Sequence, residues 1–142
     1  MSLSRFERTV AVTAIGETVF DAAKRMRDAH VGCLVVVRGR RPVGILTDRD
    51  LAVRVVAGGL DPKTTRVSEV VTYEAATLLR SDGIDTAVAR MKEHGVRRMP
   101  IVDDEGNLVG IITADDLIQL LTTELFALGE SIADNVDSSD SK

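Results

Sequence analysis

The sequence predicts an α/β (α+β) fold in which two similar β-α-β-β-α units pack together with pseudo-two-fold symmetry. Three observations support this prediction. The chain has 142 residues, 44% of them hydrophobic, which suits one compact domain or two very small ones. A stretch of the N-terminal half recurs in the C-terminal half with the same order of elements. Within each copy, apolar residues at helical spacing are followed by continuous apolar runs typical of buried strands.

The internal repeat has an offset of 65 residues, which becomes 66 after the turn between Val37 and Val43. A one-residue insertion in a turn is easily absorbed, so the shift does not weaken the match. The matching pairs include Ala22/Ala87, Arg25/Arg90, Met26/Met91, Val31/Val96, Gly44/Gly110, Ile45/Ile111, Thr47/Thr113, Asp50/Asp116 and Leu51/Leu117. We therefore divide the chain into unit 1 (8–59), a connector (60–74), unit 2 (75–128) and a helix end with an acidic tail (129–142).

Local patterns define the elements of unit 1. Thr18 is placed to cap a helix with one apolar face, formed by Val19, Ala22, Ala23 and Met26. Short apolar runs between turn signals indicate buried strands at 10–13, 33–37 and 43–46. Thr47 is placed to cap a second helix, and Gly58 and Gly59 stop it.

Unit 2 follows the same order. A strand is expected at 76–79, then a helix whose apolar face is formed by Ile84, Ala87, Val88 and Met91. Two strands forming a hairpin are expected at 99–102 and 108–112, and Thr113 is placed to cap the last helix. In the connector, Asp61, Pro62 and Lys63 mark a turn.

The last helix has apolar residues at alternating spacings of 4 and 3, which resembles a coiled-coil seam. The seam residues are Ala114, Ile118, Leu121, Leu125, Leu128 and Ile132. Packing on its own unit explains the first half of this seam equally well. We expect the second half, 125–132, to pack across a homodimer, and residues 134–142 to form a frayed polar tail.

Composition argues against several function classes. One cysteine excludes a disulfide framework and a Cys-rich zinc site, and two separated histidines disfavour any other metal site. No window of 18 uninterrupted apolar residues occurs, and residues 1–8 lack an apolar signal-peptide core, so we expect a cytoplasmic protein with no membrane contact. Four aromatic residues are too few for a base-stacking surface, which makes nucleic acid an improbable partner. No nucleophile–base constellation or P-loop is recognisable, so we predict no enzyme, no catalytic residue and no obligatory cofactor.

Net charge is distributed unevenly. The whole chain has a formal charge of −4. Seven acidic residues and one lysine follow Ala114 and sum to −6, which leaves +2 for the first 114 residues. The basic residues are mostly arginine, 14 against 4 lysines. Arginine presents a planar fork suited to phosphate and carboxylate.

Two strings carry a family resemblance: Gly44-Ile45-Leu46-Thr47-Asp48-Arg49-Asp50-Leu51 and Gly110-Ile111-Ile112-Thr113-Ala114-Asp115-Asp116-Leu117, supported by 32–37 and 97–103. The chain resembles a stand-alone tandem pair of cystathionine β-synthase (CBS) domains, a Bateman module, over roughly residues 8 to 125. The resemblance implies a regulatory or sensor module that binds AMP, ADP, ATP or S-adenosylmethionine in clefts between the units. It also implies signalling to a separate, unknown protein by a change in unit orientation, and dimer formation.

The repeated Thr-x-x-Asp pattern has a physical rationale of its own. A helix N-terminus favours an anion such as phosphate, and a carboxylate in the first turn can accept hydrogen bonds from ribose hydroxyls. With the resemblance, this predicts a first cleft at Thr47 and Asp50 and a second cleft at Thr113 and Asp116. The alternative is that each pair only caps its helix.

Arg97 and Arg98 of unit 2 are expected to reach the phosphate held in the first cleft. Alternatively they are solvated or pair with Asp103 and Asp104. Unit 1 has no charge at the aligned positions, Gly32 and Cys33. The second cleft is therefore expected to be empty or to take an uncharged adenosyl group.

The adenine ring is expected against the first strand of a unit, clasped by aliphatic side chains and backbone because aromatic residues are scarce. The ring is expected around 10–13 or 76–79, and the named candidates are Val12, Thr13 and Thr77, with Pro100 from the string at 97–103. The alternative function is a ligand-free dimeric scaffold or protein-interaction module.

Overall fold

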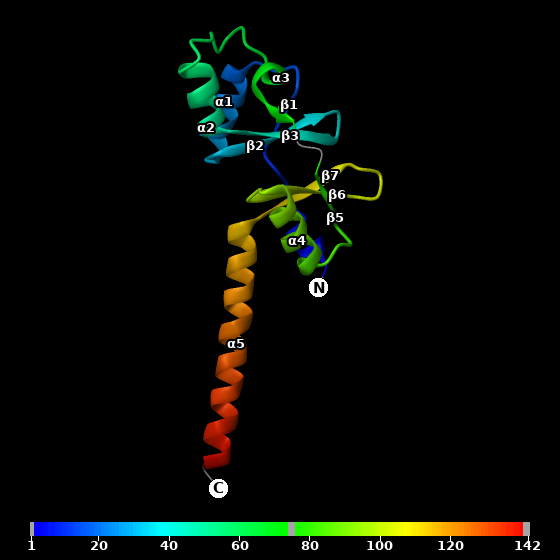
Figure 1. Ribbon diagram of the computed structural model, residues 1–142, viewed down its shortest axis with the longest axis vertical. Coiled ribbons are helices and arrows are strands. Elements are labelled where there is room, and N and C mark those ends of the chain that lie inside the picture. The colour runs from blue at the N-terminus through cyan, green and yellow to red at the C-terminus, as the bar shows by residue number, and fades with distance from the viewer. Residues whose placement is uncertain (1, 74–75, 141–142) are drawn as a thin grey trace.

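The computed structural model describes residues 2–73 and 76–140. Figure 1 shows two lobes stacked on each other, with one long helix leaving the second lobe. The fold is of the mixed α/β class, with one small sheet in each unit. The predicted fold class is thus confirmed.

Unit 1 is built on a four-stranded sheet in the order β1-β2-β3-β4. Strand β1 is parallel to β2, and β2 and β3 form an antiparallel hairpin. Thr18 caps the first helix as predicted, since its side chain accepts a hydrogen bond from the backbone N–H of Asp21 at 3.2 Å. The elements are β1 (Val12–Ala14), α1 (Val19–Ala29), β2 (Cys33–Arg38), β3 (Arg41–Thr47), α2 (Asp48–Asp50) and the π-helical turn η2 (Leu51–Val56) that continues α2.

Unit 2 repeats this plan on a three-stranded sheet in the order β5-β6-β7. Its elements are β5 (Leu78–Leu79), α4 (Ile84–His94), β6 (Arg98–Val102), β7 (Leu108–Thr113) and α5 (Ala114–Asp140). Strands β1 and β5 begin two residues later than the sequence indicates. The expected frayed tail from Asp134 is wrong as far as Asp140, because α5 continues through it.

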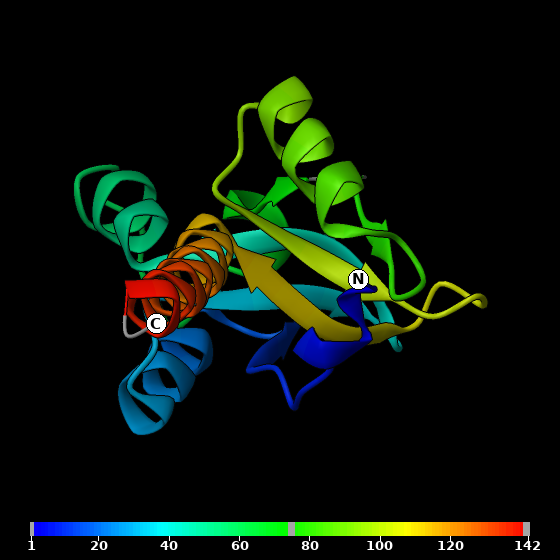
Figure 2. The same ribbon diagram turned by 90° about the horizontal axis from the view of Figure 1, so that it is seen from below.

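The segment that precedes each unit packs on the other unit. Before unit 1, η1 (Leu3–Phe6) lies against unit 2, where the Leu3 side chain is fully buried and its N–H donates to Asp82 O at 3.0 Å. In the connector, α3 (Val67–Val70) and β4 (Thr72–Tyr73) join unit 1, and Val67 is fully buried there. Figure 2 shows the N-terminal segment beside the sheet of unit 2. The sequence patterns predicted none of η1, α3 and β4.

Two glycines allow these segments to approach closely. Gly44 pairs with Tyr73 of β4, and Gly110 forms a bridge with Glu7. A β-carbon at Gly44 would lie 2.5 Å from the carbonyl oxygen of Thr72, and one at Gly110 would lie 2.5 Å from that of Phe6. The repeated glycine thus has a structural cause.

Each unit has its own hydrophobic core, and a third cluster joins the two. The core of unit 1 packs α1 and η2 on its sheet, and that of unit 2 packs α4 and the start of α5. The third cluster comprises Val35, Val37 and Ile111, with Val10, Val12 and Leu108 packed against it. The two sheets therefore meet through aliphatic side chains. In the described ranges, no helix combines the length and apolarity needed to cross a bilayer.

The close approach at the glycines generates a test. Gly44→Ala and Gly110→Ala should each lower the free energy of unfolding by about 1–3 kcal/mol, because the added methyl overlaps the crossing backbone. Gly16→Ala is the matched control, since a β-carbon there meets nothing within 4 Å. Urea denaturation measures all three. A loss at Gly16 equal to that at the other two would contradict the explanation.

Candidate functional site

The two Thr-x-x-Asp pairs form the same capping arrangement at the starts of α2 and α5. The backbone N–H of Asp50 donates to Thr47 Oγ1 at 3.1 Å, and the N–H of Thr47 donates to Asp50 Oδ2 at 2.9 Å. The corresponding distances between Thr113 and Asp116 are both 3.0 Å. Each pair therefore caps its helix, as the structural alternative proposed.

Capping leaves binding capacity at both side chains in the first cleft. The Thr47 oxygen accepts in the cap, so its O–H can still donate. Asp50 uses Oδ2 in the cap, while Oδ1 lies 3.9 Å from Arg54 Nε. A carboxylate accepts several hydrogen bonds, so Asp50 retains room for a ligand hydroxyl. The two roles do not exclude each other.

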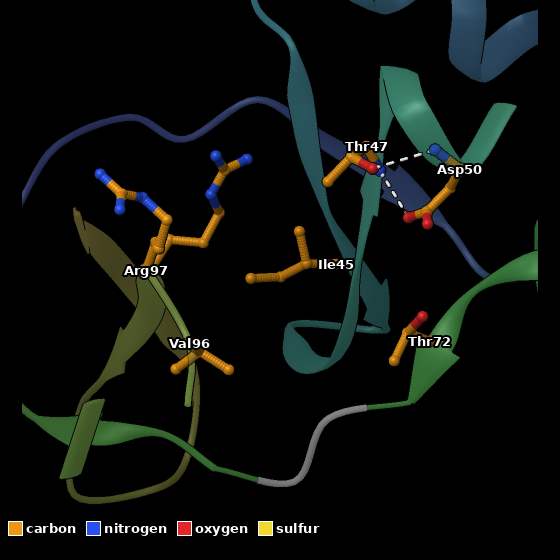
Figure 3. A pocket seen from close by; sticks show the side chains of 7 residues that line it. Ile45, Thr47, Asp50, Thr72, Val96 and Arg97 are labelled. Carbon is orange, nitrogen blue, oxygen red and sulfur yellow. Dashed lines mark hydrogen bonds between the residues drawn. The ribbon is translucent and has the colours of Figure 1, made fainter. Parts of the chain in front are cut away.

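The first cleft is a pocket of about 260 Å³ between the two units. Thr47 and Asp50 lie at one side, on unit 1, and Arg97 lies opposite, on unit 2 (Figure 3). Among the described residues, its lining is Ile45, Thr47, Asp50, Thr72, Val96, Arg97 and Arg98. The four predicted polar residues thus share one pocket. Thr72, which the sequence analysis missed, enters because β4 runs along β3.

The arginines of this pocket are not engaged by the acids that the alternative named. Arg97 Nη2 lies 3.5 Å from Asp115 Oδ1, and both side chains are largely exposed, at 75% and 86%. Arg98 forms no ion pair with a described residue. Asp103 instead holds the β6–β7 turn: the backbone N–H groups of Asn107 and Glu105 donate to it and keep the pKa of its carboxyl below the usual value.

The second cleft is a pocket of about 340 Å³ that contains Thr113 and Ile111. Its other described lining residues are Arg8, Thr9, Val10, Ala11, Val31, Cys33 and Val35. Arg8 Nη2 donates to Ile111 O at 3.1 Å and to Asp116 Oδ2 at 3.3 Å. The second cleft therefore holds a cation that does not come from the aligned positions Gly32 and Cys33. The crossing N-terminal segment brings Arg8 in, and no local pattern signals that contact.

The four residues named as contacts of the adenine ring, Val12, Thr13, Thr77 and Pro100, do not line either cleft in the described part of the chain. The described lining does include Val10 and Ala11 of the expected segment 10–13, both in the second cleft. Val12 packs against the cluster between the sheets. Thr13 is fully buried, and its hydroxyl has no hydrogen-bond partner in the described part of the chain. Pro100 is buried within β6 opposite Ile111.

The described residues contain no group of three or more His, Cys, Asp or Glu side chains arranged to hold a metal ion. Cys33 is half-buried in the wall of the second cleft and forms no disulfide.

Comparison with known proteins finds the CBS domain model over residues 7–57 and 67–123. YhcV of Bacillus subtilis, a CBS domain-containing protein, is 40% identical over 108 residues, which are 76% of each chain. Hypoxic response protein 1 of Mycobacterium tuberculosis is 35% identical over 124 residues, 85% of this chain and 86% of that one. The uncharacterized protein MK0525 of Methanopyrus kandleri is 35% identical over 114 residues, but this chain spans 58% of its length.

Solved structures share the fold. The crystal structure of Hypoxic Response Protein I with two coordinated zinc ions superposes with a TM-score of 0.73 at 31% identity, over 84% of this chain and 98% of that one. A hexameric CBS-CP12 protein from bloom-forming cyanobacteria gives 0.70 at 27% identity, over 83% and 66% of the chains. PAE2072 of Pyrobaculum aerophilum, complexed with AMP, gives 0.72 over 87% and 99%; at 24% identity it shows the fold alone.

The contact between Arg8 and Asp116 can be measured by a double-mutant cycle. Arg8→Ala and Asp116→Ala should couple by about 0.2–1 kcal/mol, because the pair is partly buried and joins two units. The control cycle, Arg97→Ala with Asp115→Ala, should couple by close to zero, since that pair is exposed. Urea denaturation of both cycles gives the coupling energies. Equal couplings would show that the Arg8–Asp116 pair stabilises the fold no more than an exposed ion pair does.

Proposed function

The chain belongs to the CBS domain family, and on that premise we propose that it is a regulatory module that binds an adenine nucleotide or adenosyl ligand in the clefts between its two units. The observation that carries the proposal is the first cleft, where a hydroxyl and a carboxylate of unit 1 face two arginines of unit 2. A ligand that contacts residues of both units can bind fully only when the units hold one relative orientation.

The residues of the first cleft suit the parts of a nucleoside phosphate. Asp50 accepts from ribose hydroxyls, and the Thr47 hydroxyl donates to a phosphate oxygen. Arg97 and Arg98 supply charge-assisted hydrogen bonds to the same phosphate from across the cleft. Ile45 and Val96 are the aliphatic surfaces available to the adenine ring. We therefore assign AMP, ADP or ATP to this cleft.

The second cleft favours a less anionic ligand. Its one cation, among the described residues, is Arg8, and Asp116 already neutralises it. S-adenosylmethionine or another adenosyl compound of low negative charge fits this balance better than a triphosphate. The base would lie against Val10 and Ala11 of the adjoining segment.

Regulation follows from differential affinity. A ligand shifts the orientation of the units only as far as it binds one arrangement more tightly than the other. We propose that a cytoplasmic homodimer transmits this shift to a separate protein, and that the chain has no catalytic role of its own. PAE2072, which shares the fold, has been solved with AMP.

A ligand-free scaffold is the second candidate, because capping explains Thr47 and Asp50 without any ligand. A thermal-shift panel of AMP, ADP, ATP and S-adenosylmethionine separates the two. A binding ligand at 100 times its Kd should add about 2.7 kcal/mol to the free energy of unfolding. No shift with any of the four would favour the scaffold.

Calorimetric titration tests the first cleft directly. Arg98→Met should weaken AMP binding by about 10- to 100-fold, because a charged hydrogen bond to phosphate contributes about 1.5–3 kcal/mol, and should leave adenosine binding unchanged. Asp50→Ala should weaken both compounds, since both carry the ribose. Arg38→Met, at an exposed position of the β2–β3 hairpin, is the control and should change neither. AMP affinity unaffected by both Arg98→Met and Asp50→Ala would refute the assignment.

A further inference from the structure

The second half of α5 is the largest feature of the molecule that the ligand clefts do not explain. The CBS domain match ends at residue 123, while α5 continues to Asp140 and projects from the lobes (Figure 1). Five apolar side chains along one face of α5 are 49–69% exposed: Ile118, Leu121, Leu125, Leu128 and Ile132. A contiguous apolar stripe of this kind marks an interaction surface.

The spacing of the stripe indicates another helix as its partner. With Ala114 at the start, the stripe residues alternate in steps of 4 and 3, the pattern of a two-helix seam. Glu130 and Asp134 occupy the opposite positions of the helix, away from the seam. The acidic residues therefore do not prevent this face from pairing with an identical one, although Glu124 flanks it.

The seam continues into a groove between α4 and α5 on unit 2. This groove, which we call the α4–α5 groove, has a volume of about 430 Å³. Its described lining is Val88, Met91, Lys92, Gly95, Val96, Arg97, Ala114, Leu117, Ile118 and Leu121. The lining is thus mostly apolar and includes two cations, Lys92 and Arg97.

We propose that α5 of a second copy docks antiparallel along this seam, with its distal end in the α4–α5 groove. The proposal deepens the homodimer of the proposed function and rests on it. In the antiparallel register, Leu121 packs against the second copy's Leu125, and Ile118 against its Leu128. Ala114 then faces the second copy's Ile132, so the smallest seam residue meets a large one. Each of these side-chain pairs occurs twice in the dimer, as a two-fold axis requires.

Charge favours the antiparallel arrangement over the parallel one. The residues after Ala114 sum to −6 and the rest of the chain to +2. Antiparallel packing brings the acidic distal end of α5 near the second copy's groove, which contains Lys92 and Arg97 (the latter paired with Asp115), whereas parallel packing sets two acidic ends side by side. Only Glu124 meets its own counterpart, near the two-fold axis. Removing that one repulsion by Glu124→Gln should therefore tighten the dimer modestly.

Sedimentation equilibrium tests the surface with a matched pair of variants. Leu125→Asp should raise the dimer Kd by about 100-fold or more, because it buries a charge in the seam. Phe126→Asp is the control: Phe126 is 67% exposed on the same helix but lies off the seam, so its dimer Kd should stay within about threefold of the wild type. Circular dichroism checks that both variants remain folded. A wild type that is monomeric at tens of micromolar, or a Leu125→Asp variant that dimerises normally, overturns the proposal.

Disulfide trapping tests the orientation in a Cys33→Ser background. Leu121→Cys and Leu125→Cys chains with different affinity tags are mixed and oxidised. Antiparallel docking links the two tags, whereas parallel docking links each variant to itself. AMP titration of the wild type, together with its oligomeric state, separates this inference from the ligand assignment. A wild-type monomer that binds AMP would contradict only the docking proposal. A wild-type dimer that does not bind AMP would contradict only the ligand assignment.

Discussion

The exchange of short segments between the units is the constraint on which the rest of the structure depends. The segment before unit 1 packs on unit 2, and the segment before unit 2 packs on unit 1. The core of unit 2 therefore contains Leu3, and the core of unit 1 contains Val67. The units cannot separate without exposing these side chains. The crossing segments also supply a wall of each cleft, Thr72 in the first and Arg8 in the second.

The same scaffold yields two different clefts because only a few side chains change. The capping pairs are alike to within about 0.1 Å in their hydrogen bonds. The difference lies opposite them: Arg97 and Arg98 face the first pair, while Cys33 takes that place at the second and Arg8 neutralises Asp116. The internal repeat thus retains the capping pairs that shape each cleft, while the residues opposite them differ and set the charge of the cleft.

Local features of the fold could be predicted, and non-local ones could not. The helices and hairpins follow from periodicity and capping residues, which act within one turn or one strand. Leu3 packs in a core formed by residues 76–117, and no local pattern indicates so distant a contact. The site divides in the same way. Thr47 and Asp50 follow from a repeated string, but Arg8 enters through the crossing segment. Val12 and Thr13 do not line either cleft, because a short strand pattern does not reveal which of its residues face a cleft.

Arg97 connects the first cleft with the α4–α5 groove. It lines both the first cleft and the α4–α5 groove, its carbonyl oxygen accepts the N–H of Ala114 at 2.7 Å, and its guanidinium pairs with Asp115. That pair is exposed, so it contributes at most about 1 kcal/mol, whereas a charged hydrogen bond to phosphate contributes about 1.5–3 kcal/mol. A phosphate in the cleft would therefore take the guanidinium from Asp115 and change the charge at the groove. By linkage, whatever docks in the groove must alter phosphate affinity by the same factor.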